Sequence, residues 1–153
     1  MSISERLAEL GITLPKAMAP VANYVPVSIT GNLVTVSGQL PAISGKVAVT
    51  GKLGADVSLE EGQHAARLCL INVLAQLEAA LPGGLDSVSK VVRLGGFISC
   101  VPDFTQHAVV MNGASDLTVA VFGEAGRHAR STIGVPCLPL DAAVEVEGLF
   151  YIG

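Results

Sequence analysis

The sequence predicts an α+β domain in which a mixed β-sheet carries two main helices on one face. Three observations predict it: two long helical segments that begin at capping residues, strand-like runs that outnumber them, and a hairpin signal between strands. The order β-β-β-α-β-α-β-β fits an α+β layer better than a doubly wound parallel sheet. Two helices cover one face only, so the other face must be hidden, which points to self-association.

The N-terminal segment, residues 2–10, is predicted to form a short amphipathic helix. Ser2 and Glu5 stand at capping-box spacing, and Gly11 follows as a stop. Two strands are expected next, because Gly31-Asn32 is a two-residue hairpin signal between apolar runs. These strands should cover residues 24–30 and 33–37, with a third short strand at 46–49.

Two longer helices are expected further along the chain. Ser58 and Glu61 form a second capping box, which begins a helix that extends to about residue 81. The other helix should begin at Pro102-Asp103, with Asp103 as its cap, and run to residue 122 before Gly123. Strands are expected at 88–100 and in two runs that begin at residues 129 and 143.

The last quarter of the chain holds the side chains of greatest chemical interest. Arg130 begins one strand-like run, Leu138-Pro139 breaks it, and the second run carries Glu145 and Glu147 at alternate positions. We therefore expect a guanidinium and a carboxylate on two neighbouring strands. Arginine offers a planar fork to a substrate carboxylate, and a glutamate can orient water or move a proton. This predicts a site for a small carboxylated substrate.

Composition narrows the class of protein. We treat residues 1–153 as one domain, with 1–17 as an N-terminal helical extension. Half of the residues are hydrophobic, 14% are charged and the mean hydropathy is +0.59, which favours burial of surface in an oligomer. No apolar run reaches the roughly 20 residues of a membrane span. The first residues lack the features of a secretory signal, so a cytoplasmic location is expected.

Charge and cysteine usage argue against a nucleic-acid-binding protein and against a metalloprotein. The net charge is −4, and nine lysines and arginines are scattered rather than clustered, so no nucleic-acid partner is expected. The three cysteines show no metal-ligand spacing, and we interpret them as small buried hydrophobic residues in a reducing compartment. No metal and no cofactor are expected.

Several short motifs occur in a distinctive order along nearly the whole chain after about residue 18. They are Tyr24, Val36-Ser37-Gly38-Gln39-Leu40-Pro41, Asn72, Gly84-Leu85, Asn112, Arg130-Ser131, Leu138-Pro139 and Glu145. In this order and spacing the chain resembles the YjgF/RidA family, also labelled the endoribonuclease L-PSP family.

The resemblance implies a chorismate-mutase-like fold assembled as a homotrimer with clefts between subunits. It also implies a hydrolase of the 2-iminobutanoate/2-iminopropanoate deaminase type, which converts reactive enamines and imines such as 2-aminoacrylate to 2-oxo acids and ammonia. In that picture Arg130 grips the substrate carboxylate and Glu145 positions water. Tyr24, Ser37 and Asn112 line the cleft, and the main chain of Thr132 contributes hydrogen bonds. Family deaminases usually carry a cysteine where this chain has Thr132.

Other interpretations remain open at this stage. The same cleft would serve a non-catalytic trimer that senses small carboxylates. The ribonuclease activity of the older family label would need basic phosphate-binding groups, which the acidic balance disfavours, and a chorismate mutase rests on fold analogy alone. Arg130 could instead pair with Glu145 or Glu147, Tyr24 could be an ordinary packed aromatic residue, Ser37 could serve a turn, and Asn112 could be a surface polar residue.

Overall fold

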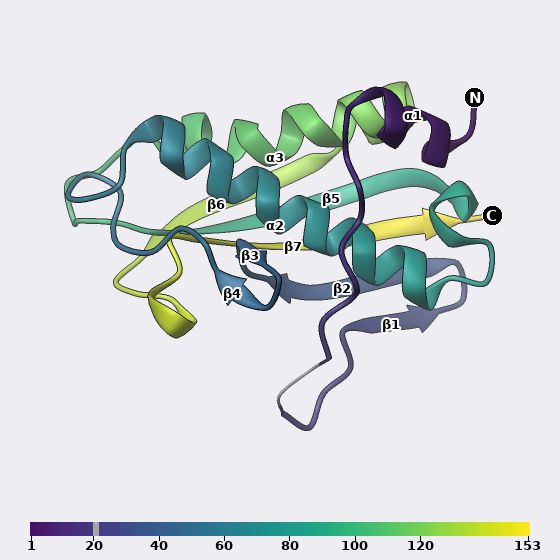
Figure 1. Ribbon diagram of the computed structural model, residues 1–153, viewed down its shortest axis with the longest axis horizontal. Coiled ribbons are helices and arrows are strands. Elements are labelled where there is room, and N and C mark those ends of the chain that lie inside the picture. Colours follow the sequence, from purple (N-terminus) through teal and green to yellow (C-terminus); the bar gives the residue numbers. More distant parts are fainter. Residues whose placement is uncertain (20–21) are drawn as a thin grey trace.

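The fold is a five-stranded sheet with two long helices packed across one face, as expected (Figure 1). The computed structural model describes residues 1–19 and 22–153. The strands and α-helices are α1 (Ile3–Glu9), β1 (Val27–Thr30), β2 (Leu33–Gln39), β3 (Ala42–Ile43), β4 (Lys46–Val47), α2 (Leu59–Ala80), β5 (Val88–Ser99), α3 (His107–Phe122), β6 (Ala129–Val135) and β7 (Val144–Ile152). No helix in the described part of the chain is long and apolar enough to cross a membrane.

The strand order in the main sheet is β1-β2-β7-β5-β6. The pair β5–β6 is parallel and the other pairs are antiparallel, so the sheet is mixed, as predicted. The expectation that the strands of Arg130 and Glu145 are neighbours is wrong. The strand β5 lies between them, because α3 connects β5 to β6 as a parallel crossover and β7 then returns on the far side of β5.

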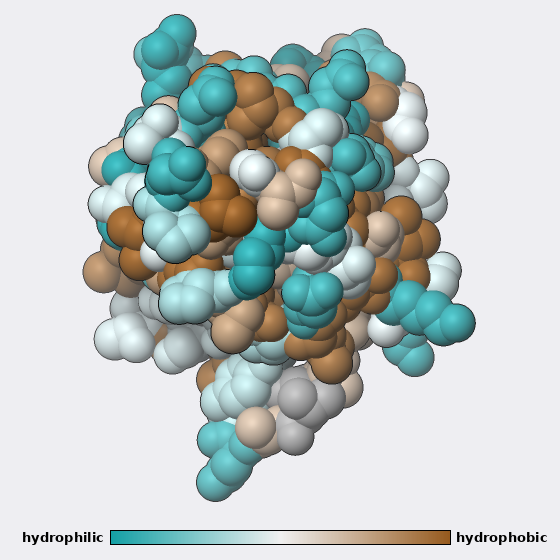
Figure 2. Space-filling view, turned by 90° about the vertical axis from the view of Figure 1, so that its left-hand side faces the viewer, coloured by the Kyte–Doolittle hydropathy of each residue, from teal (hydrophilic) through white to brown (hydrophobic). Residues whose placement is uncertain are grey.

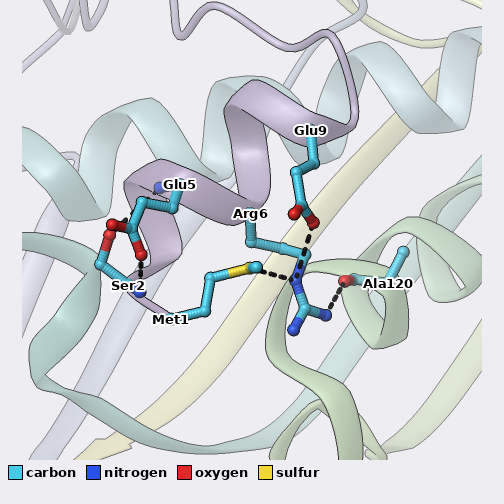
Figure 3. A network of polar contacts seen from close by, with 6 residues as sticks. All are labelled: Met1, Ser2, Glu5, Arg6, Glu9 and Ala120. Atoms are coloured by element: carbon cyan, nitrogen blue, oxygen red, sulfur yellow. Dashed lines mark hydrogen bonds and ion pairs between the residues drawn. The ribbon is translucent and has the colours of Figure 1, made fainter.

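Both predicted capping boxes are present. Ser2 Oγ accepts from the backbone N–H of Glu5, whose carboxylate accepts from the N–H of Ser2, and Ser58 and Glu61 form the same exchange at the start of α2. Arg6 then ties α1 to the end of α3, because its Nη1 donates to the carbonyl of Ala120 at 3.1 Å (Figure 3). The N-terminal helix is thereby fixed to the domain.

Some predicted boundaries differ from the structure. The helix α3 begins at His107 and not at Asp103, and Gln106 precedes it without a side-chain capping bond. Residues 101–104 form a loop instead of the first helical turn. The N–H of Val101 donates to the carbonyl of Leu53, and the N–H of Phe104 donates to the carbonyl of Val101 within a turn. The first strand begins at residue 27 and not at the predicted residue 24, because Tyr24 lies in a bend. The third strand is a two-residue piece, β4, which pairs with the unpredicted β3.

The core fills the space between the helices and the sheet. Its largest fully buried side chains include Phe150, Leu94, Ile98, Leu70 and Leu74. The two long helices approach each other closely at Gly113, where a Cβ atom would collide with the carbonyl of Gln63. A glycine at this helical position therefore sets the helix spacing and fixes where the polar face of α3 meets β6.

Within the described residues, no helix covers the second face of the sheet. By register, this open face presents Glu145 beside Phe97, Glu147 beside Gly95, and the exposed Ile133 and Tyr151. The apolar side chain of Ile133 is 52% exposed, because nothing in the single chain packs over it. Self-association through this face stays a prediction.

Candidate carboxylate site

Arg130 lies on the helix face of β6 and is held by α3. Its Nη1 donates to Oδ1 of Asn112 and to Oγ of Ser115, both at 3.0 Å, and its Nη2 donates to the carbonyl of Ala108 at 3.3 Å. These acceptors occupy successive turns of one side of α3, since residues 108, 112 and 115 are four and three apart. The structure therefore brings the predicted pair Arg130 and Asn112 together.

Ser115 is a site residue that the sequence analysis missed. Its Oγ lies 2.9 Å from Nε2 of His128, while Nδ1 of His128 lies 2.6 Å from the carbonyl of Gly126. Because a carbonyl accepts only, Nδ1 carries a proton, and in the neutral imidazole Nε2 then accepts from the Ser115 hydroxyl. That hydroxyl then directs its lone pairs at Arg130. Ser115 could have been identified from the sequence by its spacing, because it lies one helical turn after Asn112.

The guanidinium of Arg130 keeps donors for a ligand. Arginine carries five N–H donors, and three are used by the described residues. The two that remain are the N–H of Nε and one on Nη2. These adjacent donors form the side-on fork that binds a carboxylate with two parallel hydrogen bonds. The arginine is thus fixed on one edge and free on the other.

Thr132 follows Arg130 on the same face of β6. Its Oγ1 is buried and has no hydrogen-bond partner among the described residues. Gly96, its neighbour across the parallel pair, leaves it room, because a Cβ there would lie 3.3 Å from Cγ2 of Thr132 and 2.5 Å from Sδ of Met111. A buried hydroxyl without a partner is uncommon and costs free energy. The Thr132 hydroxyl is therefore a candidate hydrogen-bonding group at this site, in addition to the main chain of Thr132 that the family resemblance implied.

Glu145 lies on the opposite, open face of the sheet. Partial burial raises the pKa of its carboxyl group, and the charge of Glu147 two residues along the strand raises it further. Gly38 leaves the space that the Glu145 carboxylate occupies, since a Cβ at that position would force the carboxylate to move. The carboxylate of Glu147 forms an ion pair with the guanidinium of Arg93, with Oε2 and Nη1 3.9 Å apart.

Ser37 belongs to the Glu145 side. Its register position near the irregular pairing between β2 and β7 places it at a cavity that it shares with Gly38, Arg93 and Glu147. The hydroxyl of Ser37 donates to the carbonyl of Val25 at 2.9 Å. Tyr24 is 51% exposed and lines a smaller cavity that also touches Gly38. Tyr24 and Ser37 therefore lie together near one end of β2.

The predicted site residues form two groups on opposite faces of one chain. Arg130, Asn112 and Thr132 lie between β6 and α3, and Glu145, Ser37 and Tyr24 lie on the β2–β7 side. The predicted meeting of Arg130 and Glu145 within a single chain is therefore wrong. The same geometry excludes an ion pair of Arg130 with Glu145 or Glu147 within one chain.

The fold and the site together define the class: an α+β domain in which an arginine is held between a strand and a helix. Comparison with known proteins gives the family. Residues 4–151 match the sequence profile of the YjgF/chorismate mutase-like family, a group also labelled as endoribonucleases. The chain belongs to the YjgF/RidA family.

Individual relatives extend over nearly the full chain. Protein TCP17 of Trypanosoma cruzi is 49% identical over 148 residues, which cover 96% of this chain and 92% of the relative. The 2-iminobutanoate/2-iminopropanoate deaminase of Escherichia coli K12 is 34% identical over 138 residues, with 90% and 94% coverage. A crystal structure of a protein of unknown function from Agrobacterium tumefaciens superposes with a TM-score of 0.91 at 50% identity, covering 99% and 94% of the two chains.

Proposed function

We propose that this protein hydrolyses reactive enamine and imine intermediates, such as 2-aminoacrylate, to 2-oxo acids and ammonia. The observation that carries the proposal is the Arg130 fork. Three acceptors on α3 fix one edge of the guanidinium and leave the Nε and Nη2 donors for the substrate carboxylate. The similarity to the Escherichia coli deaminase supports the same substrate class.

Glu145 is the proposed proton-handling group. Addition of water to an imine carbon requires a base for the water proton, and release of ammonia requires an acid at the amine nitrogen. A carboxyl group whose pKa is raised toward neutral pH by burial and by Glu147 can do both in turn. Such general acid–base assistance is worth roughly 100-fold or more. Because imines hydrolyse readily in water, this help and orientation by Arg130 suffice.

The proposed site is completed by a second copy of the chain. Arg130 and Glu145 lie on opposite faces, so one substrate can touch both only if the open face of one subunit meets the β6–α3 edge of the next. Two different patches that meet in this way make a head-to-tail contact, which gives a ring when the rotation between subunits closes. We propose a homotrimer with three such clefts, in which Tyr24, Ser37 and Glu145 come from one subunit and Arg130, Asn112 and Thr132 from its neighbour.

The decisive experiment is an imine-hydrolysis assay. An amino-acid oxidase generates imines from several amino acids, and release of 2-oxo acid is followed with the wild-type protein, Arg130→Ala and Glu145→Ala. We expect acceleration by the wild type, its loss in Arg130→Ala, and a fall of roughly 100-fold in Glu145→Ala. A folded oligomer that accelerates hydrolysis of none of these imines would contradict the deaminase proposal.

A binding or regulatory role is the second candidate. It is supported by one observation: residues of a single chain hold the Arg130 fork, whereas catalysis would need Arg130 and Glu145 to meet between two chains. Calorimetric titration with 2-oxo acids separates the two. Binding that depends on Arg130, together with no turnover, supports the sensor, while turnover supports the enzyme.

A further inference from the structure

A second pair of reactive side chains lies at the far end of β5, away from the Arg130 fork. Sγ of Cys100 is 3.6 Å from Nε2 of His107, the first residue of α3. Cys100 directly follows β5 and is partly buried. A thiol in hydrogen-bond contact with an imidazole is the arrangement that activates a cysteine as a nucleophile.

The surrounding residues hold this pair in place. The ring of Phe104 packs edge-on against the imidazole of His107, with centroids 5.2 Å apart and planes at 66°. Gly134 of β6 leaves the space in which the two groups meet, because a Cβ there would lie 2.6 Å from Nε2 of His107 and 2.7 Å from Sγ of Cys100. The end of β5, the start of α3 and β6 together therefore bring the thiol and the imidazole into contact.

The thiol and imidazole open into a surface cavity of about 620 Å³. Most of its lining is apolar and comes from the 101–104 loop and the end of β6, and Lys52 is the one charged residue in that lining. This volume falls in the range of small-molecule sites. Figure 2 views this end of the molecule, where hydrophobic residues reach the surface between hydrophilic ones.

We propose that Cys100 and His107 form a thiol-addition site for small α,β-unsaturated carbonyl compounds that carry a negative charge. The apolar lining suits the planar unsaturated carbon skeleton, and Lys52 favours the anion. Gly134 is four residues beyond Arg130 on the same strand face, a spacing of roughly 13 Å. The site is therefore distinct from the Arg130 fork and does not depend on the proposed deaminase activity.

The reaction balances without an oxidant or a further co-reactant. The sulfur of Cys100 bonds to the β-carbon of the electrophile, and the carbon–carbon double bond opens toward the carbonyl. Nε2 of His107, in the tautomer protonated on Nδ1, accepts the thiol proton and returns it to the α-carbon. The product is a thioether on Cys100.

The two remaining cysteines serve as controls within the same molecule. Cys137 is exposed, and the contacts of the described residues pair it with no imidazole. Cys69 is fully buried, and this burial raises the pKa of its thiol well above the ordinary value, so it should not react. Differences in rate between Cys100 and Cys137 therefore report the effect of His107 and the cavity.

The test is competitive alkylation of the oligomeric protein at pH 7 with N-ethylmaleimide and with N-carboxymethylmaleimide, followed by peptide mass spectrometry. We expect Cys100 to react at least about ten times faster than Cys137. His107→Gln should abolish this advantage and leave the Cys137 rate unchanged. Lys52→Gln should slow Cys100 toward the anionic maleimide by about threefold, with no change toward the neutral one.

Gly134→Ala is the second variant, since its methyl group separates the thiol from the imidazole while both side chains remain. It should reduce the Cys100 rate in the same way as His107→Gln, and circular dichroism establishes that each variant is folded. A wild-type Cys100 that reacts no faster than Cys137 overturns the proposal without any variant. An advantage that survives both substitutions overturns it as well.

Discussion

The side chains of Arg130 and Glu145 lie in opposite kinds of environment within one chain. Arg130 is held by three acceptors, all from α3, and one of them is the Ser115 hydroxyl that His128 contacts. Glu145 is partly buried beside a second carboxylate, and both effects disfavour its charge. The comparison teaches that the fold preorganises the group proposed for binding, whereas it keeps the group proposed for proton transfer in an environment that disfavours its charge and makes its protonation easier.

The largest expected effect is on the arginine fork. Arg130→Lys keeps the charge but removes the paired Nε and Nη2 donors, so a bidentate contact worth roughly 2–3 kcal/mol is lost. We expect kcat/KM for imine hydrolysis to fall about 100-fold. Arg127→Lys is the matched control, because Arg127 is exposed and pairs with Glu124 outside the site. A lysine variant with wild-type kcat/KM would mean that Arg130 acts only as a charge.

Mixing two inactive variants tests whether Arg130 and Glu145 meet between subunits. In a ring, a cleft is intact when its Arg130 comes from a Glu145→Ala subunit and its Glu145 from an Arg130→Ala subunit. Random reassembly of equal amounts should restore about one quarter of wild-type activity. Each variant alone remains inactive under the same denaturation and refolding. Failure to recover activity, with mixed oligomers present by native mass spectrometry, would show that each cleft uses a single chain.

Ser115→Ala should produce a smaller loss. It removes one hydrogen bond to the guanidinium and leaves the acceptor nitrogen of His128 without its donor. The loss of one hydrogen bond to a charged group corresponds to about a tenfold fall in kcat/KM, mainly through KM. Ser89→Ala, on an exposed hydroxyl of β5, should have no effect. A fall in kcat alone would point to a role in proton transfer instead.

The smallest expected effect concerns stability. The pKa of Glu145 is raised in the folded protein, so ionisation of this group destabilises the fold at pH values above that raised pKa. The penalty disappears as the pH falls below the ordinary glutamate value of about 4.3. Glu145→Gln should therefore raise Tm at pH 7, and the gain should vanish near pH 4. The exposed Glu60→Gln should give no gain; an equal gain there would contradict the assignment.

Sequence patterns predicted the parts of the fold that local chemistry determines. The capping boxes at Ser2 and Ser58 fixed two helix starts, because the same side chains make the same bonds in any context. The start of α3 was misplaced, since Asp103 looks like a cap but the loop bonds to Leu53, a contact between distant segments. Arg130 and Asn112 were identified through the family motifs and do meet. The separation of Glu145 from them depends on strand order, which no local pattern encodes.

The position of β7 has a consequence for how the sheet is held together. This strand pairs with β2 on one side and with β5 on the other, so it joins the β1–β2 hairpin to the β5–β6 pair. A chain without residues 144–152 has no strand between these two parts of the sheet. Loss of β7 would therefore divide the sheet in two, whereas loss of β1 or β6 would only shorten it at an edge.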